Sequence, residues 1–263
     1  MTEFTKSVRG TFCWVELATR DPEAALKFYG ELFAWSARRV PSYRVGTYIM
    51  LQRAGKNVGG LVPIGEDMKR RGALPTWLSY VAVDDLTRSL RSAVSLGGSI
   101  ISEPMNADGG RFAVLEDPGG AALALWQDRH HTMGPWLYGD PGASCWFELT
   151  TEDIEAAGDF YSHLFGWTMA SASIAGQPYV VFKNAGTNVG GMMSPSFHME
   201  QGPMGWTAFF AVEDCEATTM RAQRMGGRLV RGPVDVRGTG RFASFQDPQG
   251  ADFAILKQRP MGR

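Results

Sequence analysis

The sequence predicts an α+β protein built from four βαβββ units, and two observations lead to this fold class. The second half of the chain repeats the first, so the protein contains two related domains. Within each half, a short strand, a helix and three further short strands follow one another twice. A long internal repeat has to be considered before any single motif, because it fixes the domain plan.

The internal repeat extends through nearly the whole chain. Residues 13–19 (CWVELAT) return as 145–151 (CWFELTT), and residues 21–35 (DPEAALKFYGELFAW) return as 153–167 (DIEAAGDFYSHLFGW). The offset between matching positions stays between 129 and 132 residues as far as the Asp-Pro pair near the end of each half. Because the same positions occur twice, a functional site can be examined in two copies.

The repeat also sets the expected domain boundaries. We expect a first domain at 8–127 and a second domain at 144–260, each made of two βαβββ units. The residues between them, 128–143, are rich in Gly, Pro and His and are predicted to form a linker. A domain of about 130 residues is of common size and can bury a core of its own.

The elements of the first domain follow from residue types and spacing. Residues 11–19 are rich in aromatic and branched side chains, which is typical of a strand. In 21–33, apolar side chains recur at the spacing of one helix face, and Asp21 and Pro22 suit the first turn. The second domain repeats the order from Ser144 onward. The remaining elements of the first are strands at 35–40, 47–52, 58–64 and 78–83, a helix at 85–95 ended by Gly97-Gly98, and strands at 99–102, 111–115 and 121–127.

The composition excludes several classes of partner. The formal net charge is −1 and the pI is about 6.4, which disfavours capture of nucleic acid or of an anionic membrane. No apolar run approaches the roughly 20 residues that span a bilayer, and the N-terminal residues lack the apolar core of a secretory signal. Three cysteines are too few for a disulfide framework. We expect a cytoplasmic protein, monomeric or homodimeric, with a small molecule as its partner.

Several motifs resemble those of one superfamily. In both halves a strand precedes D-x-x-x-x-x-x-F-Y-x-x-L-F-x-W, and each half closes with G-R-F-A-x-x-x-D-P-x-G. This pattern resembles the vicinal oxygen chelate superfamily, which includes glyoxalase I, extradiol dioxygenases and bleomycin-resistance proteins. The tandem form, with W-x-E-L opening both domains, is similar to actinobacterial two-domain proteins labelled as 27-kDa antigens or hydroxylases. The resemblance implies two glyoxalase-like domains whose curved mixed sheets enclose clefts.

The resemblance also implies where a metal would bind, and this chain has other residues at those positions. Metal enzymes of the superfamily use His or Gln on the first strand, usually His on the first strand of the second unit, and Glu near the end of the domain. Divalent metals need His, carboxylate or thiolate donors, which the residues at these positions do not supply. We therefore expect no metal, no cofactor, and neither metal-dependent glyoxalase nor dioxygenase activity. The three positions are occupied by Trp14, Leu78 and Ala124 in the first domain and by Trp146, Thr207 and Ala254 in the second.

Strand alternation then predicts which side chains line the clefts. Successive side chains point to opposite faces of a strand, so Glu16 should share the cleft face with Trp14. The same reasoning applies to Glu148 and Trp146. Aromatic strand residues are often ordinary core, but here the position corresponds to the ligand-facing one of the family. The other predicted lining residues are Leu78, Tyr80, Ala124, Trp126 and Tyr48 in the first domain, and Thr207, Phe209, Ala254 and Tyr179 in the second.

The two glutamates have a structural and a catalytic interpretation. A carboxylate on the inner face of an apolar strand is costly unless it is paired, so each could form a salt bridge, Glu16 with Arg111 and Glu148 with Arg241. A carboxyl group with a raised pKa would instead suit a general acid or base.

Two functions of different classes follow. The first is metal-independent binding of a small apolar or aromatic molecule, as in sequestering, resistance-type relatives. The second is a cofactor-free enzyme of secondary metabolism, in which Glu16 or Glu148 transfers a proton in a cyclisation, isomerisation or hydration. A third possibility is that one domain binds and the other is scaffold, because Trp126 is replaced by Leu256 in the second copy. The sequence leaves open whether unit one closes a cleft with unit two or with unit four.

Overall fold

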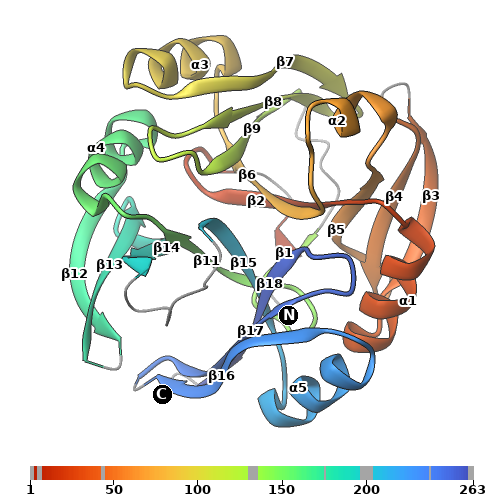
Figure 1. Ribbon diagram of the computed structural model, residues 1–263. Coiled ribbons are helices and arrows are strands. Elements are labelled where there is room, and N and C mark those ends of the chain that lie inside the picture. Colours follow the sequence, from red (N-terminus) through yellow and green to blue (C-terminus); the bar gives the residue numbers. More distant parts are fainter. Residues whose placement is uncertain are drawn as a thin grey trace.

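A computed structural model of the chain shows two curled mixed sheets, one from each half, with helices around their outer sides (Figure 1). No helix in the part of the chain that it describes is long and apolar enough to cross a membrane. The described residues are 3–4, 8–42, 45–129, 136–174, 176–195, 204–236 and 238–259.

The first sheet joins units one and two. Strand β2 (Phe12–Thr19) at the centre of the sheet pairs antiparallel with β6 (Thr76–Ala82), so that Trp14 lies opposite Tyr80. From edge to edge the eight main strands run β3-β4-β5-β2-β6-β9-β8-β7. The other elements are α1 (Pro22–Phe33), β3 (Ser36–Ser42), β4 (Gly46–Arg53), β5 (Lys56–Pro63), α2 (Glu66–Arg70), α3 (Leu86–Ser95), β7 (Ser99–Ala107), β8 (Gly110–Glu116) and β9 (Ala122–Asp128).

The second sheet joins units three and four in the same way. Its order is β12-β13-β14-β11-β15-β18-β17-β16, with β11 (Ser144–Thr150) and β15 (Gly205–Ala211) at the centre. Each cleft is therefore enclosed by consecutive units, which answers the question that the sequence left open. The remaining elements are α4 (Ile154–Phe165), β12 (Thr168–Ile174), β13 (Gln177–Asn184), β14 (Thr187–Met193), α5 (Cys215–Arg224), β16 (Arg228–Val236), β17 (Gly240–Gln246) and β18 (Asp252–Gln258).

The predicted α+β fold class is confirmed. In each unit, an aspartate caps the N-terminus of the main helix. Each of these side chains accepts a hydrogen bond of 2.8–3.0 Å from the backbone N–H three residues later, which satisfies an otherwise unpaired donor. The four capping residues are Asp21, Asp85, Asp153 and Asp214. The short helix α2 was not predicted, because its five residues lie in a stretch that reads as a loop.

The largest hydrophobic cluster contains residues of both halves, and a smaller cluster lies within each sheet. Phe12 stacks on Phe147 of the second half, and their ring centroids are 3.9 Å apart. The ring centroids of Phe33 and Phe210 are 5.2 Å apart. The helices pair across the halves as well, α1 beside α5 and α3 beside α4. The amphipathic faces of the helices thus pack within a core to which both repeats contribute.

Two buried hydrogen-bond chains connect the halves. The Tyr29 hydroxyl accepts from Trp77 Nε1 at 2.9 Å and donates to Asp247 Oδ2 at 3.0 Å. Burial and the nearby Asp247 charge raise the pKa of Tyr29 well above its usual value, so it remains a donor. The F-Y and D-P motifs of the repeat therefore join the halves together. The mirrored chain consists of Trp206, Tyr161 and Asp117, with distances of 2.8 Å and 2.8 Å.

Part of the expected linker belongs to the first sheet. Residues Trp136–Leu137 form β10, which pairs antiparallel with β1 (Glu3–Phe4) and parallel with β5, where Trp136 lies opposite Asn57. The Trp136 side chain is buried. Residues 130–135 of the predicted linker lie outside the described residues. The segment 136–143 is thus part of the fold.

Candidate functional site

A cavity of about 610 Å³ lies within the curl of the first sheet. Its walls come from strands of both units, β2 to β5 on one side and β6 to β9 on the other. The large apolar and aromatic side chains of the lining are Trp14, Val40, Tyr48, Met50, Tyr80, Phe112 and Trp126; the polar and small residues are Glu16, Arg38, Pro41, Ser42, Asn57, Asn106, Ala107, Asp108 and Gly109.

Five of the residues predicted for the first cleft line this cavity: Trp14, Glu16, Tyr48, Tyr80 and Trp126. Strand alternation placed them on the correct face. Leu78 and Ala124 lie instead in the hydrophobic cluster next to the cavity, and Ala124 is fully buried. The side chains of Leu78 and Ala124 are shorter than those of their aromatic neighbours, so the aromatic side chains form the cavity wall.

Trp14 and Tyr48 form a hydrogen-bonded pair in the cavity wall. Trp14 Nε1 donates to Tyr48 Oη at 2.9 Å. The hydroxyl lies directly over Gly60 of β5, where an added Cβ would be 1.7 Å from Tyr48 Oη. Such a separation is far inside van der Waals contact, so only glycine permits this position of the tyrosine. The second glycine of the Gly59-Gly60 pair therefore serves a close contact within the sheet.

The second half repeats this arrangement and extends it to a carboxylate. Trp146 Nε1 donates to Tyr179 Oη at 2.9 Å, and an added Cβ on Gly191 would lie 2.1 Å from that oxygen. Tyr179 Oη in turn donates to Glu148 Oε2 at 3.0 Å. The remaining predicted residues, Phe209 and Ala254, lie in a cluster with Trp146, and Thr207 pairs with Glu148 between β11 and β15.

The carboxyl group of Glu148 is electrostatically perturbed. Burial raises its pKa to about 7, although the hydrogen bond from Tyr179 and the charge of Arg231 both act to lower it. Burial also lowers the pKa of Arg231, which the charge of Glu148 opposes. The group thus titrates in the range that suits proton transfer near neutral pH.

The cation near Glu148 differs from the one considered from the sequence. Arg241 forms ion pairs with Glu216 and Asp235, not with Glu148. Arg231 of β16 is instead the arginine that interacts with Glu148, and its guanidinium carbon lies 5.5 Å from the centre of the Phe242 ring. The sequence did not reveal this residue because its counterpart in the first half is Ser102.

The donor set does not fit the divalent metal of the superfamily. Indole, isobutyl and methyl groups occupy the three ligand positions of the first half, and none of these groups is a ligand for a divalent ion. Among the described residues, no three His, Cys, Asp or Glu side chains are grouped so that they could hold an ion. His130, His131 and His198 lie outside those residues. The absence of a metal stays a prediction.

Sequence reasoning missed some of the cavity lining. Phe112 belongs to the repeated G-R-F-A motif, and Met50 follows Tyr48 at the spacing of one strand face, so both could have been found. Asn106 at the end of β7 and Asp108 in the β7–β8 turn carry no such signal. Trp136, which packs in the cluster beside Trp14, comes from the segment predicted as linker.

Comparison with known proteins identifies the class. The model of the Glyoxalase/Bleomycin resistance protein/Dioxygenase superfamily matches residues 11–125 and 145–255. The chain therefore belongs to this superfamily, and its two matches coincide with the two sheets.

Curated relatives cover nearly the full chain. "Putative glyoxylase CFP32" of Mycobacterium tuberculosis is 38% identical over 96% of each chain. "Anthracycline biosynthesis protein DnrV" of Streptomyces peucetius is 33% identical over 97% of this chain and 96% of its own.

Solved structures of low identity share the fold. The 2,3-dioxygenase LapB from Pseudomonas sp. KL28 has a TM-score of 0.62 at 11% identity, covering 98% of this chain and 95% of its own. The Mn(II)-bound glyoxalase from Novosphingobium aromaticivorans has a TM-score of 0.61 at 15% identity, covering 96% and 84%. At such identities the likeness concerns the fold alone.

Proposed function

We propose that the protein binds a small, flat, largely aromatic molecule in the cavity of its first half, without a metal. The observation that carries this proposal is the cavity of about 610 Å³ with Trp14, Tyr80, Phe112 and Trp126 in its walls. Sites for drug-sized ligands measure roughly 300–1,000 Å³ and are lined mainly by apolar and aromatic groups. Aromatic walls favour ring systems, which they contact by stacking or edge-to-face packing.

One polar atom of the wall suggests how the ligand is oriented. Trp126 Nε1 is buried and has no hydrogen-bond partner among the described residues. A buried donor without an acceptor is costly, so a ligand carbonyl or hydroxyl oxygen that reaches Nε1 after a rotation of the indole ring would be favoured. We therefore expect the ligand to be a polycyclic aromatic compound that carries such an oxygen.

The relatives support a role in secondary metabolism. DnrV and DauV are named as anthracycline biosynthesis proteins, and each covers nearly all of this chain. Anthracyclines contain a fused, oxygen-bearing aromatic ring system, which matches the ligand chemistry inferred from the walls. The glyoxylase name of CFP32 does not bear on metal chemistry here, because the donor set of this chain does not fit a divalent ion.

Calorimetric titration with 1,2-dihydroxyanthraquinone tests the proposal. We expect saturable binding of one molecule per chain that is unchanged in the presence of a chelator. Trp126→Leu copies the second half and is expected to weaken binding, whereas Leu256→Trp should not weaken it. The proposal would be contradicted if the anthraquinone did not bind, or if its binding required a divalent ion.

A second candidate function is cofactor-free acid–base catalysis, and the state of Glu148 favours it. A carboxyl group with a pKa of about 7, hydrogen-bonded to a tyrosine and near an arginine, is suited to move a proton in a cyclisation, isomerisation or hydration. Glu16 is its counterpart in the wall of the first cavity. Mass spectrometry of a bound ligand before and after incubation distinguishes the two functions. A product that forms with the wild type but not with Glu148→Gln or Glu16→Gln would establish catalysis.

A further inference from the structure

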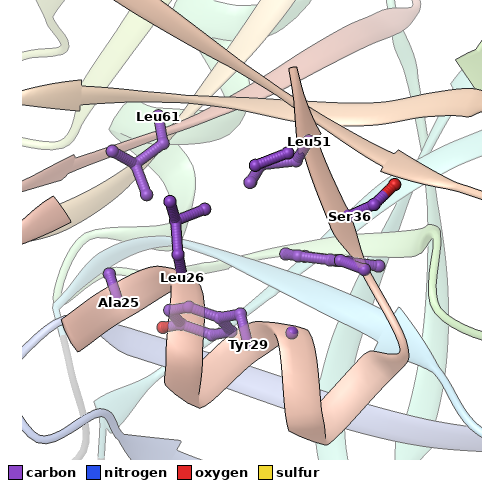
Figure 2. A pocket seen from close by; sticks show the side chains of 9 residues that line it. Ala25, Leu26, Tyr29, Ser36, Leu51 and Leu61 are labelled. Carbon is purple, nitrogen blue, oxygen red and sulfur yellow. The ribbon is translucent and has the colours of Figure 1, made fainter. Parts of the chain in front are cut away.

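An arginine on the edge strand β3, Arg38, lines the large cavity of the first half. Its position follows from strand alternation and pairing. Figure 2 shows Leu51 and Leu61 on the side of helix α1, opposite Leu26, so the neighbouring positions of their strands face the cavity. Arg38 lies beside Met50 in the pairing of β3 with β4, and both residues line the cavity. Arg38 therefore projects from the same face of the sheet as the aromatic walls.

The two adjacent arginines of β3 differ in their partners. Arg39, on the other face of the strand, forms an ion pair with Glu23 of helix α1. Arg38 is exposed and makes no hydrogen bond or ion pair with another residue in the described part of the chain. In the second half Ala170 takes the place of Arg38, so the framework that both halves share does not need this arginine. The charge of Arg38 is thus free to act on a molecule in the cavity.

A second donor lies near Arg38, across strand β4. Asn57 of β5 lines the cavity, and its Oδ1 accepts a hydrogen bond from Gln52 Nε2 at 3.0 Å. Because the oxygen of the amide is used, the Nδ2 group is what Asn57 offers to the cavity. Gln52 follows Met50 by two residues on β4, so Asn57 and Arg38 flank successive positions of one strand face. This end of the cavity therefore offers hydrogen-bond donors, one of which is charged.

The carboxylates of the lining lie on other segments. Glu16 lies in the same transverse row of the sheet as Arg38, with Met50 and Gly60 between them. Three strand spacings of about 4.8 Å separate their backbones by about 14 Å along the sheet. Asp108 belongs to the turn between β7 and β8, at the opposite edge of the sheet. Neither carboxylate forms an ion pair with Arg38, so the cationic and acidic groups of the described lining remain separate.

We propose that the ligand of this cavity is an aromatic acid, whose rings lie between the aromatic walls and whose carboxylate binds Arg38 and Asn57 Nδ2. This assignment rests on the proposed function, because it needs a ring system in the cavity. A guanidinium group donates two parallel hydrogen bonds to a carboxylate, and charge makes such bonds about twice as strong as those between neutral groups. The acid lies at the exposed strand β3 and keeps part of its hydration, which limits the cost of desolvation. Arg38 thus favours acids over neutral molecules of the same shape.

Calorimetric titration of the full chain with two probes of matched shape tests this assignment. The probes are 9,10-anthraquinone-2-carboxylate and 9,10-anthraquinone-2-carboxamide, which differ in the charge of one substituent at neutral pH. We expect the carboxylate to bind about fivefold to tenfold more tightly, as for a charge-assisted hydrogen bond at a partly exposed position. The preference should decrease at high salt, because ions screen an exposed pair.

Variants locate the origin of the preference. Arg38→Ala copies the second half and should bind both probes with the affinity that the wild type has for the carboxamide. Arg39→Ala is the matched control and should retain the preference, since it removes an arginine from the other face of the same strand. Asn57→Asp keeps the acceptor for Gln52 Nε2 and replaces the donor with a negative charge. It should weaken binding of the carboxylate more than binding of the carboxamide.

The possible outcomes separate this assignment from the proposed function. Equal affinity of the wild type for both probes, or a preference that persists in Arg38→Ala, would overturn the role of Arg38 and leave binding of aromatic molecules in place. Binding of neither probe would overturn it as well. The titration with 1,2-dihydroxyanthraquinone then shows whether the proposed function has failed too.

Discussion

The clefts of the two halves share one framework and differ in what they contain. Both have a strand tryptophan that donates to a tyrosine hydroxyl, and both place that hydroxyl over a glycine. In the first half Trp126 lines a cavity of about 610 Å³, and Ser102 of the neighbouring strand β7 is bonded to the backbone of Val114. In the second half the counterparts are Leu256 and Arg231, and the arginine interacts with Glu148. The second half thus lacks one aromatic ring of the first cleft and has an arginine near its glutamate.

This difference shows how the two halves of a duplicated fold can diverge on one scaffold. The Trp–Tyr pair restrains both side chains in each half, because neither can move without loss of a partly buried hydrogen bond. Changes on the strands of the second unit of each half then alter the chemistry and leave the framework intact. We infer that binding of the aromatic ligand belongs to the first half and proton transfer by Glu148 to the second.

The largest expected effect concerns the charge of Glu148. Its pKa of about 7 in the folded chain lies above the ordinary value of 4.5, so the folded state binds the proton more tightly than the unfolded state. Stability should therefore fall as the pH rises from about 4.5 to 7, by about 3 kcal/mol in total. Glu148→Gln should remove this fall, which denaturant unfolding at pH 5 and pH 8 would measure. Glu152→Gln, at an exposed position, is the control and should unfold like the wild type.

The glycines under the tyrosines come next. Gly60→Ala should displace Tyr48, destabilise the chain by about 1–3 kcal/mol and weaken binding of an aromatic ligand. Gly191→Ala should destabilise by a similar amount and leave that binding unchanged. Thermal unfolding and calorimetric titration of both variants would measure the two effects. Equal loss of binding in both would show that the ligand site is not confined to the first half.

The tryptophans themselves test the wall directly. Trp14 is half-buried in the cavity wall, so Trp14→Ala should weaken binding of an aromatic ligand by about 1–3 kcal/mol while the protein remains folded. Trp14→Phe keeps an aromatic ring and should retain more of the affinity. Trp146→Ala should not change the affinity. If Trp14→Ala melts far lower yet binds as the wild type does, the residue belongs to the core and not to the site.

The smallest effect is expected from Arg231. Its charge lowers the pKa of Glu148, so Arg231→Ser, which copies the first half, should raise the pKa of that carboxyl further. NMR titration of the Glu148 side chain would show the shift. Arg241→Ser is the matched control, since Arg241 pairs with Glu216 and Asp235. A larger shift in the control would contradict the assignment of Arg231.

The sequence predicted much of the framework, and its failures share a physical origin. The repeat and strand alternation placed Trp14, Tyr80 and Trp126 on the cleft face, because both depend on local spacing. The contact of Tyr48 with Gly60 and the approach of Arg231 to Glu148 depend on which strands become neighbours. Trp136 was missed because its strand has only two residues, and so short a strand has no periodicity to detect. Alternation predicts on which face of a strand a side chain lies, but not which residue of another strand it contacts.

The crossed Trp–Tyr–Asp chains have a consequence for the covalent connection between the halves. Each half supplies a tyrosine donor and an aspartate acceptor to the other, and Phe12 and Phe147 stack between them. These contacts between described residues join the two halves directly. A chain divided between Arg129 and Trp136 should behave as a split protein, in which the two fragments reassemble when they are produced together. Either fragment alone would expose the aromatic faces that its counterpart covers, and it should aggregate.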